Sequence, residues 1–479
     1  MIEAWSIVIV VSPLVAAAIC AACRHARVAE FANLIASFVC VVAAVSLACN
    51  VRDGYRFLHD YVVVDALAAW TLVCTALVYC LASIYAVGYM RFLAEERERL
   101  PNFYALFALF AATMICGPVM NNIGVYWIAI ELTTLVSTFL VGFERGREAI
   151  EAAWKYIIVV SAGISLALLG TVLFYWAGSL VIGPTYDMTW DTLRHAAPQM
   201  SPALTQMAFL LVLVGYGTKA GLAPMHTWLP DAHSEGPAPV SAMLSGALLN
   251  TAMLGIARFL TITDAASSSL LPRTVLVAFG AFSLFVAALF IVKQQGIKRL
   301  MAYSSVEHMG VLALGFGFGG PLAIAAVLYH MLNHSLNKSL MFFGAGNVMR
   351  VFGTKDMGEI RNVWTRFPVT GAPPFGLFLS ELTLMRAGIA SSNAWAVIVM
   401  LLLLIVIFIG FLNHFRAMYF EARPAGEAHE IVRKASVSAW MTVPMWLALV
   451  PVLILGVWWP QDLWRFFEMV AADLGGVAR

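Results

Sequence analysis

Long apolar runs, separated by short polar segments, dominate the chain. Fourteen of them approach or exceed the roughly 20 residues with which a helix crosses about 30 Å of hydrocarbon. Barrel strands are shorter and alternate in polarity, whereas these runs are continuous. The pattern therefore predicts an all-α polytopic membrane protein of about 14 transmembrane helices, near residues 4–22, 27–49, 62–90, 103–121, 123–143, 150–178, 203–222, 237–262, 271–293, 303–318, 321–347, 367–388, 393–420 and 437–458.

Composition agrees with this pattern. Hydrophobic residues make up 61% of the chain and charged residues 12%, and the mean hydropathy is +0.85. The first run lacks a basic leading segment, so we expect it to remain as a helix and not to be cleaved as a signal peptide. The net charge of +2 predicts no nucleic-acid surface. All seven cysteines precede residue 117, and only Cys20 and Cys23 form a CxxC pair, so we interpret them as packing residues.

The basic residues indicate how the chain is oriented in the membrane. Nineteen of the 29 lysines and arginines lie in loops that follow odd-numbered predicted helices, and six lie in the other loops and the two tails. Positive loops stay in the cytoplasm. We therefore expect both termini to lie outside, in the inner membrane of a bacterial or archaeal cell.

Four charged residues lie deep inside predicted helices, namely Glu131, Lys219, Lys338 and Glu381. A charge at mid-membrane costs about 2.5–3.5 kcal/mol, so the four together represent roughly 10 kcal/mol unless they pair or meet water. A purely structural Glu131–Lys219 ion pair is the alternative, but buried pairs stabilise poorly because desolvation offsets their attraction. Their depth therefore favours a functional role.

Two histidines accompany the deep lysine of predicted helix 11. His330, His334 and Lys338 are spaced by four residues, which places them on one helix face over about 12 Å of rise. Imidazole and a desolvated lysine both exchange protons near neutral pH, so the stripe resembles a proton relay. Hydrogen bonding between helices is one alternative. A zinc site is another, but no carboxylate or thiolate stands at matching spacing, and no metal is expected.

Glycine and proline interrupt two of the charged helices. The breaks are "YGTKAGLAPMHTWLP" around Lys219 and "TGAPPFGLFLSELTL" before Glu381. Broken helices at corresponding places in two halves are typical of inverted-repeat transporters. We predict helices 1–3 in residues 1–100, a first five-helix inverted repeat in 101–265 with helix 7 broken, a second in 266–422 with helix 12 broken, and a last helix with a tail in 423–479.

Four motifs resemble those of the antiporter-like membrane subunits shared by respiratory complex I, multisubunit cation/proton antiporters and group 4 membrane-bound hydrogenases. They are "KAGLAPMHTWLPDAHSEGPAPVSAMLSGALLN", "IKRLMAYSSVEHMG", "LYHMLNHSLNKSLMFFGAG" and "GAPPFGLFLSEL". Within this family the forms "HTWLPDAHSE", "SSVEHMG" and "APPFGLFLSEL" are most similar to component F of hydrogenase 4 and to its relatives in formate hydrogenlyase-type complexes. The resemblance covers nearly the whole chain.

The resemblance implies a proton-translocating subunit without a redox centre or cofactor of its own. Its partners would be other membrane subunits and a peripheral hydrogenase or dehydrogenase arm of an oxidoreductase complex. The site residues implied by the family's motifs are the same set that the deep charges select: Glu131, Lys219, His330, His334, Lys338 and Glu381.

The chain departs from many complex I relatives in two places. Asn250 stands where they have a lysine in helix 8, and Gly296 replaces an acidic residue. We hypothesise that Glu131 keeps Lys219 charged until a partner subunit loosens the pair. A proton then passes through water toward the stripe on helix 11. Glu381 connects that stripe to the outside.

Two other functions stay open on the sequence alone. One is sodium/proton exchange, which the dominance of lysine and histidine disfavours, since sodium prefers oxygen ligands. The other is a passive membrane anchor for a soluble hydrogenase or dehydrogenase arm. A stand-alone enzyme is not expected, because the sequence carries no cofactor or metal motif.

Overall fold

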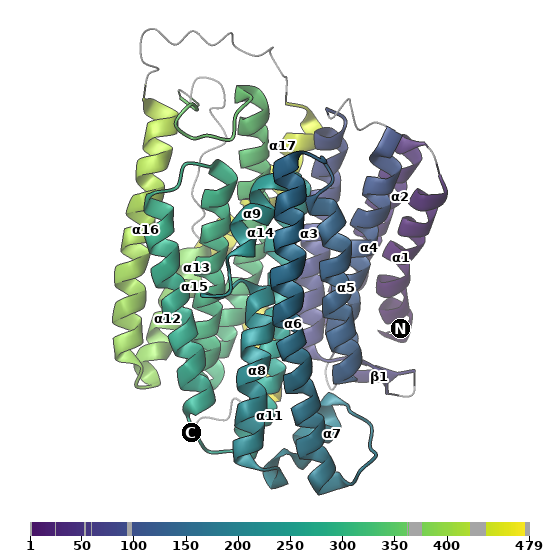
Figure 1. The fold of residues 1–479 in the computed structure, drawn as a ribbon, viewed down its shortest axis with the longest axis vertical. Helices are drawn as coiled ribbons and strands as arrows, with labels where there is room; N and C mark the ends of the chain where they lie inside the picture. The colour runs from purple at the N-terminus through teal and green to yellow at the C-terminus, as the bar shows by residue number, and fades with distance from the viewer. Residues whose placement is uncertain are drawn as a thin grey trace.

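Long helices lie side by side along the long axis of the molecule (Figure 1). The computed structural model describes residues 2–23, 25–51, 54–58, 60–92, 98–361, 363, 376–421 and 437–474. The helices of its first half are α1 (Ile2–Ala22), α2 (Ala26–Asn50), α3 (Ala66–Met90), α4 (Leu100–Val119), α5 (Ile123–Val141), α6 (Arg147–Ile182), α7 (Trp190–Ala196), α8 (Pro202–Ala220), α9 (Trp228–Glu235), α10 (Ala238–Met243) and α11 (Leu249–Ala266).

The second half continues the bundle. A 3-10 turn η2 (Ala197–Gln199) precedes α8, and a π-helical segment η3 (Leu244–Leu248) joins α10 to α11. The remaining helices are α12 (Leu271–Val292), α13 (Ile297–Phe318), α14 (Gly320–Phe352), α15 (Gly376–Ala390), α16 (Ala394–Phe420), α17 (Ala439–Val457) and α18 (Gln461–Asp473). Every predicted apolar run thus overlaps a helix, which confirms the all-α membrane fold.

The predicted third helix begins four residues too early. Residues Val62–Val64 form strand β2, which pairs antiparallel with β1 (Tyr55–Phe57), so Val62 faces Phe57 and Val64 faces Tyr55. Asp65 then caps α3, because its carboxylate accepts a hydrogen bond from the Ala68 N–H at 2.7 Å. The valines extended the apolar run, but β-branched residues also suit a strand.

Predicted helix 10 is longer than expected, because α13 begins at Ile297 and not at 303. Lys298 interrupts the apolar pattern but is only 4% exposed. Its ammonium donates to the carbonyls of Ser234 at 3.0 Å and Gly236 at 2.6 Å, which replace its water. The break predicted before Glu381 lies largely outside the described residues, because the structure describes that helix from Gly376 onward.

Among the described residues, eleven helices are long and apolar enough to cross a membrane. The polar helices α13 and α14 are not among them, although nearly all of their side chains are buried. Helix α14 contacts α3, α10, α13, α15, α17 and α18, and it lies near the middle of the bundle (Figure 1). The polar helices are therefore shielded from lipid by the apolar ones.

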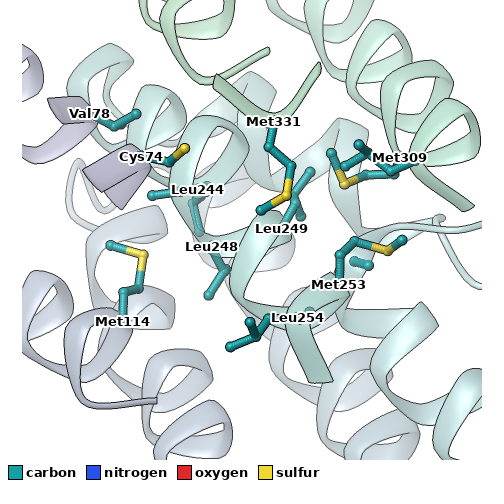
Figure 2. Close-up of a cluster of buried hydrophobic side chains, with 14 of the residues drawn as sticks. Cys74, Val78, Met114, Leu244, Leu248, Leu249, Met253, Leu254, Met309 and Met331 are labelled. Carbon is teal, nitrogen blue, oxygen red and sulfur yellow. The ribbon is translucent and has the colours of Figure 1, made fainter. Parts of the chain in front are cut away.

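Small residues let two helix pairs approach closely. A Cβ added to Gly163 of α6 would lie 2.5 Å from the Thr218 Cβ of α8, and one added to Gly280 of α12 would lie 2.7 Å from the Gly310 carbonyl of α13. Such contacts hold membrane helices together where no hydrophobic effect acts between them. Around η3, apolar side chains of α3, α4, α11, α13 and α14 fill the space between the helices (Figure 2).

Candidate functional site

The predicted break in helix 7 is confirmed, and it follows directly after Lys219. Helix α8 ends at Ala220, and Gly221 adopts the left-handed conformation at φ 78°, which glycine tolerates without a Cβ penalty. The Trp228 indole N–H donates to the freed carbonyl of Thr218 at 2.8 Å. The interruption therefore keeps its backbone groups satisfied while Lys219 occupies the last helical turn.

Lys219 is fully buried, and hydroxyl groups hold its ammonium. The ammonium donates to Thr134 Oγ1 at 2.8 Å and to the Tyr156 hydroxyl at 2.9 Å. The Thr134 hydroxyl in turn points to Glu131 Oε2 at 3.4 Å, and the Ser161 hydroxyl donates to Glu131 Oε1 at 2.7 Å. The structure thus brings Glu131 and Lys219 together through Thr134.

Asn250 lies between the two halves and is completely buried. Its amide nitrogen donates to Ser335 Oγ of α14 at 3.0 Å and to the Gly246 carbonyl of η3 at 3.2 Å. Its amide oxygen is buried without a hydrogen-bond partner among the described residues. Buried polar atoms are normally bonded to protein or to ordered water. Asn250 therefore offers an acceptor for water at the position that lacks a lysine.

The stripe of predicted helix 11 lies on α14 in the protein interior. His330 and His334 are fully buried, and Lys338 is 1% exposed. The Lys338 ammonium donates to the Met301 carbonyl of α13 at 3.2 Å. Neither ring nitrogen of His334 has a hydrogen-bond partner among the described residues. The three side chains therefore face protein groups and not lipid.

His330 belongs to a chain of hydrogen bonds that joins three helices. His330 Nδ1 lies 2.9 Å from Ser380 Oγ of α15, and His330 Nε2 lies 3.2 Å from His308 Nδ1 of α13. Glu381 follows Ser380, and its carboxylate lies within 4.8 Å of ligand nitrogens of His308 and His330. The structure therefore brings His330 and Glu381 together, as a proton relay would require.

Two residues of α13 were missed by the sequence reasoning. Glu307 is 5% exposed and His308 is 4% exposed. The carboxylate of Glu307 lies close enough to Lys338 and to Glu381 to interact with both electrostatically. The signal was present in "SSVEHMG", because Glu307 lies inside the predicted run 303–318 and the rule for deep charges applies to it.

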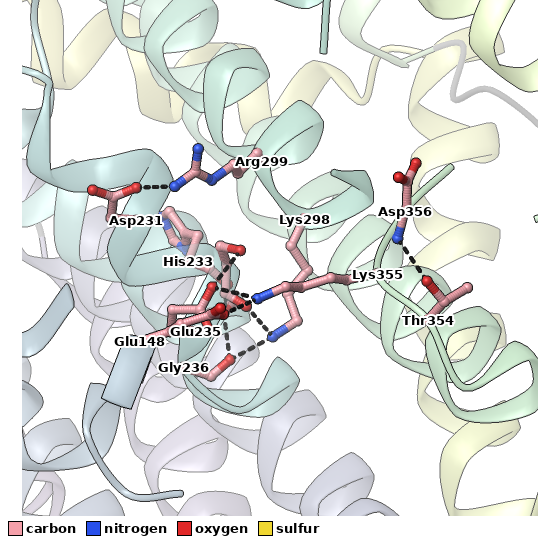
Figure 3. Close-up of polar contacts among 12 residues, drawn as sticks. Glu148, Asp231, His233, Glu235, Gly236, Lys298, Arg299, Thr354, Lys355 and Asp356 are labelled. Atoms are coloured by element: carbon pink, nitrogen blue, oxygen red, sulfur yellow. Dashed lines mark hydrogen bonds and ion pairs between the residues drawn. The ribbon is translucent and has the colours of Figure 1, made fainter. Parts of the chain in front are cut away.

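A network of hydrogen bonds and ion pairs joins charged residues of α6, α9, α13 and the segment that follows α14 (Figure 3). Lys355 pairs with Glu148 of α6 at 2.5 Å and with Glu235 of α9 at 3.0 Å. Partial burial acts to lower the pKa of Lys355, but its hydrogen bonds to these two carboxylates raise the pKa above its usual value. Asp231 pairs with Arg299 of α13 in the same network. These ion pairs join the first half of the chain to the second.

His233 lies beneath this network and is fully buried. Its ring stacks on Phe342 of α14 with centroids 4.8 Å apart, and neither nitrogen has a hydrogen-bond partner among the described residues. The imidazole of His233 lies close enough to Lys338 and Lys298 to interact with both electrostatically. His233 lies outside the long apolar runs, so the search for ionisable residues inside those runs could not identify it. Only the motif that contains "PDAHSE" includes it.

Comparison with known proteins places the chain among membrane subunits of large complexes. A hydrogenase-4 component F homolog from Methylacidiphilum infernorum is 42% identical over 285 residues, which cover 57% of this chain and 60% of that protein. Hydrogenase-4 component B from Escherichia coli is 30% identical over 366 residues, covering 71% of this chain and 52% of that protein. The chain thus spans about half to three fifths of these two relatives.

Three further comparisons cover most of the chain. NADH-quinone oxidoreductase subunit N from Desulforudis audaxviator is 28% identical over 414 residues, covering 82% of this chain and 80% of that protein. In the Mrp complex from Dietzia sp. DQ12-45-1b, one chain superposes with a TM-score of 0.83 at 21% identity, with 99% of this chain and 97% of that chain covered. A chain of an archaeal membrane-bound sulfane sulfur reductase gives 0.82 at 22% identity, covering 98% and 97%. These two likenesses confirm the fold.

A sequence profile decides the family. The profile described as NADH:quinone oxidoreductase/Mrp antiporter, TM, matches residues 120–408, which contain the deep charges of both halves. This match covers more than half of the chain and agrees with the resemblance that the four motifs carry. The chain is a multi-pass membrane protein and belongs to the NADH:quinone oxidoreductase/Mrp antiporter family of membrane subunits.

Proposed function

We propose that the chain is the proton-translocating membrane subunit of a redox-driven hydrogenase or respiratory complex. The observation that carries the proposal is the series of ionisable side chains inside the bundle, which are partly buried at Glu131 on α5 and Glu381 on α15 and fully or almost fully buried between them. Such groups are costly inside a membrane and mark ion pathways far more often than packing sites. The relatives named as hydrogenase-4 components and as a quinone oxidoreductase subunit support it.

In the first half, Lys219 holds the proton that moves. The hydroxyls of Thr134 and Tyr156 bind its ammonium form, and Glu131 stabilises that charge through Thr134. Opposite charges about 4 Å apart attract by around 4 kcal/mol at an effective dielectric of 20, and Glu131 acts from farther away, through Thr134, so its attraction for Lys219 is smaller. A change of charge in a neighbouring subunit that draws Glu131 away therefore weakens the binding of the proton to Lys219.

Between the halves, water carries the proton past Asn250. The unpartnered amide oxygen of Asn250 accepts from such a water, and Ser335 beside it leads to α14. Lys338 receives the proton on the same helix, close to the buried carboxylate of Glu307. A lysine in helix 8 is therefore not needed for a continuous path.

In the second half, the histidines pass the proton to Glu381. Each imidazole can accept on one nitrogen and donate from the other, which is the requirement for a relay. His308 and His330 share a hydrogen bond, and Glu381 lies within 4.8 Å of both. Glu381 is the last ionisable group of this series and is partly exposed, and we assign to it the exchange of the proton with the far side.

The partners and the orientation follow from the same proposal. The subunit docks against other membrane subunits, and a peripheral hydrogenase or dehydrogenase arm supplies the driving electron transfer. Both termini lie outside the inner membrane of a bacterial or archaeal cell, because the basic loops stay inside. The relatives are named as components of such complexes, which supports membrane partners.

The experiment is a Lys219→Met substitution in the intact complex, with proton uptake into vesicles followed by a pH probe. We expect pumping to be lost, because methionine keeps the volume of the side chain but carries no proton. The control is Lys293→Met, which removes an exposed lysine at the end of α12. Unchanged pumping in Lys219→Met would overturn the proposal.

Sodium/proton exchange is the second candidate, and relatives named Na(+)/H(+) antiporter subunit A1 from Staphylococcus aureus favour it at 30% identity over 341 residues. The stripe on α14 presents the nitrogen atoms of His330, His334 and Lys338, whereas sodium prefers oxygen. Proton uptake that is equally fast with and without sodium in the vesicles separates the two functions. A strict sodium requirement would support exchange.

A passive anchor makes a different prediction from both. If the chain only holds a soluble arm at the membrane, neutralising Glu131, Lys219, Lys338 and Glu381 together leaves energy-coupled growth intact. Under the proposal, the same fourfold variant keeps electron transfer and loses coupled growth.

A further inference from the structure

We propose that His308, His330 and Glu381 form a binding site for a divalent transition-metal ion of the zinc class. One ligand atom from each of the three lies within 4.8 Å of the others. Both histidine rings are buried, and the three residues come from α13, α14 and α15. Two imidazoles and one carboxylate are a familiar zinc ligand set.

The hydrogen bonds around His330 indicate which of its two ring nitrogens carries the lone pair. The Ser380 hydroxyl donates to the Leu377 carbonyl at 2.7 Å. The Ser380 oxygen therefore accepts from His330 Nδ1–H at 2.9 Å, and in the neutral ring the lone pair lies on Nε2. Metal-binding histidines are usually held in this manner, with the second nitrogen donating to a fixed oxygen.

The spacing of the nitrogens suits a tetrahedral ion. His330 Nε2 lies 3.2 Å from His308 Nδ1. Two nitrogens bound to tetrahedral zinc at about 2.05 Å are separated by about 3.3 Å. The ion takes the place of the proton that the two rings share, and the proton of His308 moves to its other nitrogen. The carboxylate of Glu381 needs to approach by up to about 1.5 Å to reach the same separation.

His334 supplies an independent observation. Its ring is fully buried, its centroid lies 5.2 Å from that of His308, and both of its nitrogens lack a hydrogen-bond partner among the described residues. Buried polar groups normally have partners, so this ring leaves an unsatisfied imidazole next to His308, although its nitrogens lie outside the cluster of three ligand atoms. The sequence disfavoured a metal because α14 alone lacks further ligands; the neighbouring helices α13 and α15 supply them.

A metal ion here blocks proton transfer, and this consequence rests on the proposed function. The ion holds the same lone pairs through which the histidines pass protons, and its two positive charges repel a proton arriving at Lys338. Metal binding itself does not depend on proton pumping. The two statements therefore fail separately, and the experiment reads them separately.

The test is zinc binding and X-ray absorption on the complex that carries the full chain, with the wild type and three variants. In the wild type, we expect one bound zinc ion with nitrogen and oxygen ligands. His308→Ala should weaken zinc binding at least tenfold. His308→Cys should keep the zinc and add a sulfur ligand at about 2.3 Å, the usual zinc–thiolate distance. His226→Cys, at an equally buried histidine outside the cluster, should add none.

The outcomes decide the site without reference to activity. A His308→Cys spectrum without sulfur, or unchanged zinc affinity in His308→Ala, overturns the metal site even if both variants fold and pump normally. A sulfur ligand in His308→Cys establishes the site. If zinc then leaves proton uptake by the wild-type complex undiminished, the site stands and the proposed route through the histidines fails.

Discussion

At the residue scale, single hydroxyl and amide groups connect the charged side chains. Glu131 reaches Lys219 through Thr134, and Asn250 reaches α14 through Ser335. A sequence shows the charges, because an ionisable residue in an apolar run is conspicuous. It does not show which threonine of "ELTTL" turns toward the lysine, since that depends on how α5, α6 and α8 pack.

Thr134→Val tests the connection between Glu131 and Lys219. The substitution removes a hydrogen bond to a charged group, worth about 1.5–3 kcal/mol, so we expect proton uptake to slow roughly 10- to 100-fold. Thr138→Val is the matched control one turn later, because the Thr138 hydroxyl donates to the Thr134 carbonyl of its own helix. Equal rates in the two variants would show that Thr134 plays no part in the transfer.

Asn250→Leu tests the path between the halves. Leucine has a similar volume but offers no acceptor to water, so we expect pumping to fall to background while the complex assembles normally. Stopped-flow measurement of proton uptake checks this, and an Asn250→Asp variant should retain transfer because it keeps the oxygen. Normal uptake by the leucine variant would place the path elsewhere.

At the element scale, hydrophobic periodicity predicted the helices well and their polar ends poorly. All fourteen apolar runs overlap a helix, because a run of about 20 apolar residues has few other solutions in a membrane. The start of α13 was missed because the ammonium of Lys298 is hydrogen-bonded by carbonyls at the end of α9, far away in the sequence. The partner of His330 was missed for the same reason, since His308 and Ser380 lie on other helices.

The break between α8 and α9 depends on Gly221. A Gly221→Ala substitution forces alanine into the left-handed region and places its Cβ 2.5 Å from Leu229 Cδ1. We expect a loss of about 1–2 kcal/mol in stability, visible as a lower thermal unfolding midpoint of the purified protein. Gly146→Ala serves as the control, because its φ is −61° and its added Cβ meets nothing within 4 Å. A midpoint equal to the control's would contradict the assigned strain.

At the scale of the whole molecule, the two sides of the bundle are distinct. Glu3 of α1 contacts Tyr55 of β1, and Arg56 of β1 pairs with Asp191 of α7, so these segments share one end (Figure 1). Asp231 of α9 and Lys355, which follows α14, take part in a separate set of ion pairs. The sidedness of the loops, inferred from charge alone, stays a prediction, as do the repeat boundaries at 101–265 and 266–422.

The orientation is tested with a membrane-impermeant thiol reagent on intact cells. In a background with Cys23 and Cys49 changed to serine, we expect Arg194→Cys on α7 to react from outside. Lys293→Cys, after α12, should react only once the membrane is opened. Both positions are exposed, so reactivity reports the side and not burial. The reverse pattern would place the termini inside.

The most direct measurement is the number of protons moved per electron in vesicles that carry the intact complex, with and without Lys338→Met. Lys338 lies on the helix that joins the two halves, and no route along the buried side chains avoids it in the proposed scheme. We predict that electron transfer continues while the proton-to-electron ratio falls by the whole contribution of this subunit. An unchanged ratio with normal electron transfer would contradict the proposal that protons cross the membrane along this axis.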